Sequence, residues 1–366
     1  MNNKNYPAWD REYAAQRNNA GPKKGQLLRQ DVYKSNSEVF HTGGYICESG
    51  KVVEYPINDP MLKATKVYAE PLDVNHIAVQ CAETATSVVN NDCIVVAKGL
   101  LDRGLNPCVM NLADAYTACG MYKRGSRAQE EHLCRTTTLS RSLFQFFKGT
   151  TKAQAQYSVD ANVEVKSIAY PMDMNYGGIY TPDVTVFRNA EDLFSFLDEP
   201  FKIAVVSVAA LDFNEKHGKN LEYKAADGSI SPEGIEIMKN KIRTIYRAAL
   251  ANGHDSLVAG AFGCGAFRLS PATVSSLFNE VLNETEFKNK FKLLVFAMLE
   301  RPRRPQGLDG HFAPFCFAAA NRLRSLIFTA PRLVISSIFI CVYIFPFSSN
   351  ILRTSSVVMA STPQPK

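Results

Sequence analysis

From Cys93 onward, the hydrophobic positions recur with two different periods, which predict alternating strands and helices. Continuous apolar runs at Cys108–Leu112, Phe201–Leu211, Ser256–Ala261 and Phe291–Leu299 are typical of strands covered on both faces. Between the second and third runs, the apolar residues of Lys241–Gly253 fall on one side of a helix, which Gly253 ends.

Two further segments carry the start or stop signals of helices. The helical spacing that begins at Cys93 ends at Gly104. Ser270 is a predicted N-cap that precedes Pro271 at the first helical position. The order strand, loop, helix, strand predicts an α/β domain with parallel neighbouring strands. Because ligands of such sheets bind beyond the carboxyl ends of the strands, we expect a site at loops 113–131 and 260–268.

The N-terminal third has weaker patterns. Residues 25–40 have the apolar spacing of a helix, and glycine-bounded alternating runs in 43–57 suggest a hairpin. A short strand is expected in 64–70, whereas 76–89 is ambiguous between strand and helix. Residues 1–25 are polar and lack the apolar core of a secretory signal, so we interpret them as a disordered or loosely attached leader.

Residues 26–320 are therefore expected to form the folded domain, followed by an apolar C-terminal tail at 321–366. The tail contains the uncharged run 333–352, which approaches the length of about 20 apolar residues needed to span a bilayer. Pro346 and four serines interrupt this run. It is compatible with a membrane anchor, with an apolar tail docked on the domain, or with a poorly determined gene end.

Composition narrows the class of protein. The chain has 366 residues, of which 46% are hydrophobic and 21% are charged, as in ordinary soluble domains. A net charge of +6 favours anionic partners, but it is too small for a dedicated nucleic-acid binder, so direct DNA binding is not expected. Nine scattered cysteines without a C-x-x-C spacing indicate a reducing, intracellular compartment, and neither they nor the six histidines predict a metal site.

The glycine-rich loop at Gly260–Phe267 follows a predicted strand and precedes a capped helix. Glycines at 260, 263 and 265 allow close approach of the backbone, and the helix adds its positive N-terminal end. These features are typical of a diphosphate cradle, although a plain tight turn explains them equally well.

Other candidate positions each have a structural alternative. Tyr176, Tyr180 and Phe187 surround Gly177 and Gly178 and could stack on an adenine, but core aromatics beside a β-turn are the more common arrangement. Asn111 and Asp114 could bind ribose hydroxyls or simply make a turn. The adjacent Glu130 and Glu131, taken alone, are typical of a solvated helix surface.

The segment from Asn111 to Phe144 resembles the signature of the microbial-type poly(ADP-ribose) glycohydrolase catalytic domain family. That family carries a Gly-Gly-Gly run followed by Gln-Glu-Glu, which correspond here to Cys119-Gly120-Met121 and Gln129-Glu130-Glu131. Segments around 93–111, 170–188, 201–212 and 257–271 agree in order, so the resemblance covers roughly residues 30–320. It implies a macrodomain-like, three-layer α/β/α fold with a mixed, largely parallel sheet.

The resemblance also implies roles for individual residues. Glu131 would be the general acid, Glu130 would bind ribose hydroxyls, and Gln129 would order the loop. The ligand would be ADP-ribose or poly(ADP-ribose) on modified proteins, and the reaction would need neither metal nor cofactor. Cleavage of a ribose–ribose bond needs a protonated carboxyl and a negative group beside the developing cation. The expected substrate-binding set is Asn111, Asp114, Gly120, Gln129, Tyr176, Gly177, Gly178, Gly260, Phe262, Gly263, Cys264, Gly265 and Phe267.

The glycine run departs from the family pattern, since only Gly120 remains. A left-handed conformation at Cys119 or Met121 would cost about 1–2 kcal/mol, and either side chain could exclude the sugar. The sequence therefore predicts a hydrolase, with a catalytically impaired ADP-ribose reader as the alternative. We discount Cys119 as a nucleophile because no histidine is suitably placed in the sequence.

Overall fold

The computed structural model describes residues 5–21, 23–189, 191–299 and 313–316, and its centre is a seven-stranded mixed sheet with the order β3-β6-β7-β5-β8-β9-β4. Strand β6 pairs antiparallel with β3 and β7, and the other neighbours are parallel. The strands are β3 (Lys66–Tyr68), β4 (Ala85–Val89), β5 (Pro107–Ala113), β6 (Gly178–Arg188), β7 (Phe196–Ala209), β8 (Ser256–Ala259) and β9 (Leu293–Ala297).

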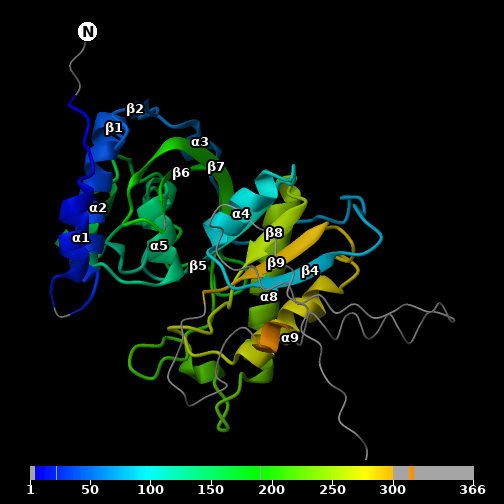
Figure 1. Cartoon of the computed structure of the whole chain (residues 1–366). Coiled ribbons are helices and arrows are strands. Elements are labelled where there is room, and N and C mark those ends of the chain that lie inside the picture. Colours follow the sequence, from blue (N-terminus) through cyan, green and yellow to red (C-terminus); the bar gives the residue numbers. More distant parts are fainter. Residues whose placement is uncertain (1–4, 22, 190, 300–312, 317–366) are drawn as a thin grey trace, which may run out of the picture.

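Helices cover both faces of this sheet (Figure 1). They are α1 (Arg11–Asn19), α2 (Gln26–Thr42), α3 (Pro60–Ala64), α4 (Cys93–Leu101), α5 (Gln129–Thr136), α6 (Leu139–Phe144), α7 (Lys152–Asp160), α8 (Pro232–Ala251) and α9 (Pro271–Leu282). Short 3₁₀ turns lie at η1 (Tyr122–Arg124) and η2 (Leu221–Tyr223), and β1 (Gly44–Ile46) and β2 (Val52–Glu54) form a separate hairpin.

Two hydrophobic cores explain the three layers. Alternate residues of a strand point to opposite faces, so Val205 of β7 joins one core while Val206 joins the other. The first core packs β5–β8 against α2, α4, α5 and α6, and the second packs them against α8 and α9. The fold is thus the three-layer α/β arrangement with a mixed, largely parallel sheet that the sequence and its resemblance predict.

The predicted elements from Gly25 onward are confirmed, with two refinements. The ambiguous segment 76–89 ends in strand β4. Helix α8 begins at Pro232, nine residues before the predicted start, because Ser231 accepts a hydrogen bond from the Gly234 N–H. The predicted N-cap at Ser270 is confirmed by its bond from the Thr273 N–H.

The interpretation of residues 1–25 as a loose leader is wrong for the part that the structure describes. Helix α1 is capped by Asp10, and Ala14 is fully buried against Leu28 and Val32 of α2. The Trp9 ring covers the guanidinium of Arg188 at 4.6 Å. The sequence does not predict this helix because α1 is polar and only weakly amphipathic.

The apolar run 333–352 lies outside the described residues. Within those residues, no helix has both the length and the apolarity needed to cross a membrane.

Candidate active site

Three loops meet beyond the carboxyl ends of β5, β7 and β8, as expected for a parallel sheet. The loop after β7 holds the loop after β8: the Phe213 N–H donates to the Phe267 carbonyl at 2.9 Å, and Asn214 Nδ2 donates to the Ala266 carbonyl at 3.0 Å. The segment before β6 joins them through a 2.8 Å bond from the Met172 N–H to the Ala115 carbonyl. Loops 113–131 and 260–268 therefore border one region.

The Gln129 side chain fixes the start of helix α5 to strand β5. Its Oε1 accepts from the Leu112 N–H at 2.9 Å, and its Nε2 donates to the Met110 carbonyl at 2.8 Å. Pairing with β8 ends at Val109, so the amide takes the place of a strand neighbour along the rest of β5. These two bonds set the position of the next residues of α5, Glu130 and Glu131.

The carboxyl group of Glu130 is buried, and its side chain is only 3% exposed. Its Oε2 accepts from the Asp114 N–H at 2.8 Å, and its Oε1 accepts from Asn111 Nδ2 at 3.3 Å. Burial, followed by the neighbouring Glu131 carboxyl, raises the pKa of Glu130 well above its usual range. Asn111 Nδ2 also donates to Ser207 Oγ of β7 at 3.0 Å, so the bond from Asn111 ties Glu130 to the sheet.

Glu131 faces the backbone of the Cys119-Gly120-Met121 turn. Its Oε1 accepts from the Met121 N–H at 3.0 Å, and the side chain is 5% exposed. A Cβ added to Gly120 would lie 2.8 Å from this Oε1 and 3.4 Å from Glu130 Oε2. Position 120 therefore has to be glycine for the two carboxyls to occupy their places.

The two departures from the glycine run have different consequences. Cys119 adopts the left-handed conformation with φ 60°, so the anticipated backbone cost applies there, whereas Met121 has φ −98° and does not need glycine. The Cys119 side chain is fully buried beside Cys134, and the Met121 side chain is 49% exposed. The hydrogen bond from this turn to Glu131 Oε1 comes from the backbone N–H of Met121, and the Met121 side chain takes no part in it.

Three buried polar atoms near the carboxyl pair have no hydrogen-bond partner among the described residues: Glu131 Oε2, Asn111 Oδ1 and the Tyr170 hydroxyl. Tyr170 lies close enough to Glu130 that this charge, after burial itself, raises the pKa of its hydroxyl. Unpartnered buried groups are costly, so their gathering at one place indicates a site shaped for a polar ligand. Sequence reasoning missed Tyr170, because nothing in its spacing distinguishes it from a core aromatic.

The remaining residues expected to contact a nucleoside make contacts within the protein as follows. The Asp114 carboxylate accepts hydrogen bonds from the N–H groups of Tyr116 and Thr117, and it thus makes the turn that was expected as the alternative to ribose binding. Tyr180 and Phe187 are buried core aromatics of β6, so base stacking by these two is wrong. Tyr176 is half-buried and lies in a turn that the Gly177 N–H closes by donating to the Asp173 carbonyl at 3.2 Å. Gly178 is the first residue of β6.

The loop at 260–267 exposes its backbone, whereas its larger side chains pack against the protein core. Phe262 and Cys264 point into the second core, and their N–H groups bond to the Gly260 and Ala261 carbonyls. Gly263 has φ +72°, while Gly265 is exposed with open space at its Cβ position. The Phe267 side chain is partly buried against the same core. Among the described residues, no group of His, Cys, Asp and Glu side chains is arranged to hold a metal ion.

The residues of this site fall within a segment that matches a known protein family. Residues 34–189 match the family model of the microbial-type PARG catalytic domain, where PARG denotes poly(ADP-ribose) glycohydrolase. This part of the chain is similar to the microbial-type PARG family. The match includes the Cys119-Gly120-Met121 turn, the Gln129-Glu130-Glu131 triplet and Tyr170, and it supports a hydrolase of the PARG type. No curated protein matched the chain.

Solved PARG structures share the fold. A PARG from Thermomonospora curvata superposes with a TM-score of 0.61 at 24% identity, over 79% of this chain and 98% of that one. The same protein bound to the inhibitor ADP-HPD gives 0.58 at equal identity and coverage. A PARG from Deinococcus radiodurans in complex with ADP-ribose gives 0.51 at 24% identity, over 73% of this chain and 96% of that one. The likeness therefore extends beyond the matched family segment, to most of the described fold.

Proposed function

We propose that this PARG-type chain cleaves the ribose–ribose O-glycosidic bonds of poly(ADP-ribose) and releases ADP-ribose, with Glu131 as the general acid. The observation that carries the proposal is the buried carboxyl pair of α5, in which Glu131 Oε2 has no partner among the described residues while its Oε1 is held by the Met121 N–H. A fixed carboxyl with one unpartnered oxygen suits transfer of a proton to a ligand oxygen.

The pair supplies the proton that this chemistry needs. Burial and the neighbouring Glu131 carboxyl raise the pKa of Glu130, which favours retention of a proton on the pair. The donors to Glu130, from Asn111 and the Asp114 N–H, oppose this rise only in part. In the proposed step, Glu131 Oε2 passes the proton shared by the pair to the bridging oxygen as the ribose–ribose bond breaks. The negative charge left on the pair stabilises the oxocarbenium ion until water attacks it.

Ligand placement follows from the surrounding backbone. Gly120 lets the sugar and the carboxyl pair lie against the turn without a side chain between them. The loop at 260–267, with Gly263 and Gly265, would receive the diphosphate, and half-buried Tyr176 would border the nucleoside.

The test compares polymer hydrolysis by the native chain and by the Glu131→Gln variant. Removal of a general acid should lower kcat by at least about 100-fold, because the amide cannot donate the proton. Glu233→Gln is the matched control, since Glu233 also lies in the first turn of a helix but is exposed. Equal turnover by the native chain and Glu131→Gln would remove Glu131 from this role.

An ADP-ribose reader without hydrolysis is the second candidate, favoured by the left-handed Cys119 and the exposed Met121 side chain beside the turn. It predicts ADP-ribose affinity in calorimetry together with no release of ADP-ribose from polymer by the native chain.

A further inference from the structure

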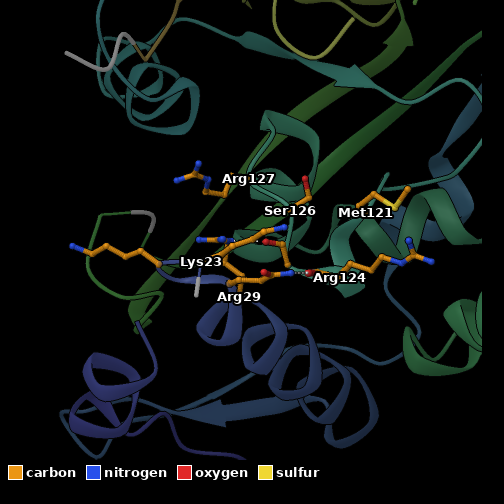
Figure 2. A pocket seen from close by; sticks show the side chains of 9 residues that line it. Lys23, Arg29, Met121, Arg124, Ser126 and Arg127 are labelled. Atoms are coloured by element: carbon orange, nitrogen blue, oxygen red, sulfur yellow. Dashed lines mark hydrogen bonds between the residues drawn. The ribbon is translucent and has the colours of Figure 1, made fainter. Parts of the chain in front are cut away.

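A cavity of about 450 Å³ is lined by residues of the loop 121–127, among them Met121, whose N–H donates to Glu131 Oε1. One wall is residues 121–127, and the opposite wall is the segment that leads into α2, residues 23–29. Figure 2 shows Met121 at one end of this cavity and Lys23 with Arg127 at the other.

The cavity is strongly basic. Five of its nine lining residues are cationic, and none is acidic: Lys23, Lys24, Arg29, Arg124 and Arg127. Among the described residues, no carboxylate lies within ion-pair distance of Lys23, Lys24, Arg124 or Arg127. Like charges gathered in one cavity repel one another, and an anionic ligand with several phosphates would relieve that repulsion.

The walls of this basic cavity are held together by specific bonds. Arg29 Nε donates to the Gly125 carbonyl at 2.7 Å, and Gln26 Nε2 donates to the Arg124 carbonyl at 3.1 Å. Gly125 has φ +75°, and a Cβ there would lie 2.6 Å from the Gln26 carbonyl oxygen, so the two walls touch through backbone. The cations are therefore held by a fixed frame that joins the start of α2 to the loop 121–127.

Met121 connects the basic cavity to the proposed proton donor. Its N–H binds Glu131 Oε1, and the residue itself lines the cavity. In poly(ADP-ribose), the ribose that leaves from the scissile bond carries a diphosphate of its own. A polymer held with its bridging oxygen at Glu131 has this next diphosphate one sugar away, and the residue that donates to Glu131 Oε1, Met121, also lines the cavity.

We propose that the basic cavity is a subsite for the diphosphate of the neighbouring ADP-ribose unit, on the leaving side of the cleaved bond. This rests on the proposed function for the identity of the bond at Glu131. It makes the polymer, rather than a single protein-linked ADP-ribose, the preferred substrate. The N-terminal segment thereby contributes to substrate choice through Lys23 and Lys24.

The experiment measures calorimetric affinities for ADP-ribose and for its ribose–ribose-linked dimer, on the full chain carrying Glu131→Gln so that neither ligand is consumed. The cavity variant combines Lys23→Ala, Lys24→Ala and Arg127→Ala. The control removes three exposed lysines elsewhere, with Lys63→Ala, Lys148→Ala and Lys288→Ala. The cavity variant should bind the dimer about ten-fold more weakly at low salt and lose most of the dimer-over-monomer preference, whereas the control keeps it. Higher salt should erode the same preference in the unaltered background.

Two results would overturn the subsite. Equal weakening of both ligands would assign the cations to the ADP-ribose site itself, and an unchanged dimer preference would show that no phosphate binds there. Hydrolysis by the native chain is scored separately. If the dimer preference depends on the cavity but the native chain does not cleave polymer, only the hydrolase proposal is contradicted. If the native chain cleaves polymer but the cavity variant keeps the dimer preference, only the subsite is contradicted.

Discussion

At the scale of single residues, the turn 119–121 shows which glycine of the family run the site requires. The φ values of 60° and 52° at Cys119 and Gly120 are both left-handed, but only Gly120 faces the two carboxyls. Cys119 turns its side chain into the core, and Met121 carries an ordinary backbone conformation. The retained glycine is therefore the one whose replacement would displace Glu131.

Gly120→Ala should abolish polymer cleavage, because its Cβ would lie 2.8 Å from Glu131 Oε1 and would add left-handed strain of about 1–2 kcal/mol. We expect a loss in kcat of at least about 100-fold, as for removal of the proposed acid Glu131. Cys119→Gly is the matched change, since it relieves the same type of strain without adding an atom near the carboxyls. A Gly120→Ala variant as active as Cys119→Gly would show that the carboxyl pair tolerates a side chain there.

The residue types of the site could be predicted from the sequence, but the contacts between these residues could not. The triplet at 129–131 marks the carboxyls through its resemblance to a family. That Asn111 positions Glu130, and that Tyr170 joins them, depends on contacts across 19 residues and on burial. No local period encodes such contacts.

At the scale of elements, helix α8 carries a buried lysine on its core side. Lys241 is 3% exposed, among apolar neighbours such as Ile237 and Ile245 of the same helix. Burial lowers the pKa of Lys241 to about 8, and the opposing attraction of Asp173 is the smaller effect. The amphipathic pattern predicts this helix, but it does not predict a buried Lys241, because sequence alone does not show which long side chains are enclosed.

Lys241→Met should stabilise the protein at pH 7. The unfolded chain binds the Lys241 proton up to about pH 10.5, and the folded chain releases it near pH 8. Between these values the native chain gains stability from this group as pH rises, and below pH 8 the full cost of about 3 kcal/mol is present. Urea unfolding at pH 7 and pH 10 should show a gain for Lys241→Met that shrinks at the higher pH. Exposed Lys288→Met should show no gain, and a pH-independent result for Lys241→Met would contradict the desolvation of its charge.

At the scale of the whole molecule, the N-terminal segment is part of the domain. Arg188 at the end of β6 is 1% exposed, and its guanidinium donates to Ser35 and Asn36 of α2 at 2.7 Å each. The rings of Trp9 and Phe196 cover it at 4.6 and 4.0 Å. The sequence pattern could not reveal this arrangement, since it joins segments that are about 180 residues apart and uses a cation as a core residue.

Trp9→Ala should therefore lower the free energy of unfolding by about 2–3 kcal/mol, through lost apolar burial and a lost cation–π contact with a desolvated guanidinium. Its indole N–H also donates to the Leu193 carbonyl at 3.0 Å, and that bond would go with it. Circular dichroism is the suitable signal for the urea titration, because Trp9 is the single tryptophan of the chain. Tyr13→Ala, on the adjoining helix but 47% exposed, should cost less than about 1 kcal/mol. An unchanged midpoint for Trp9→Ala would restore the loosely attached leader. It would also remove the support that α1 gives to α2, the helix whose start forms one wall of the basic cavity.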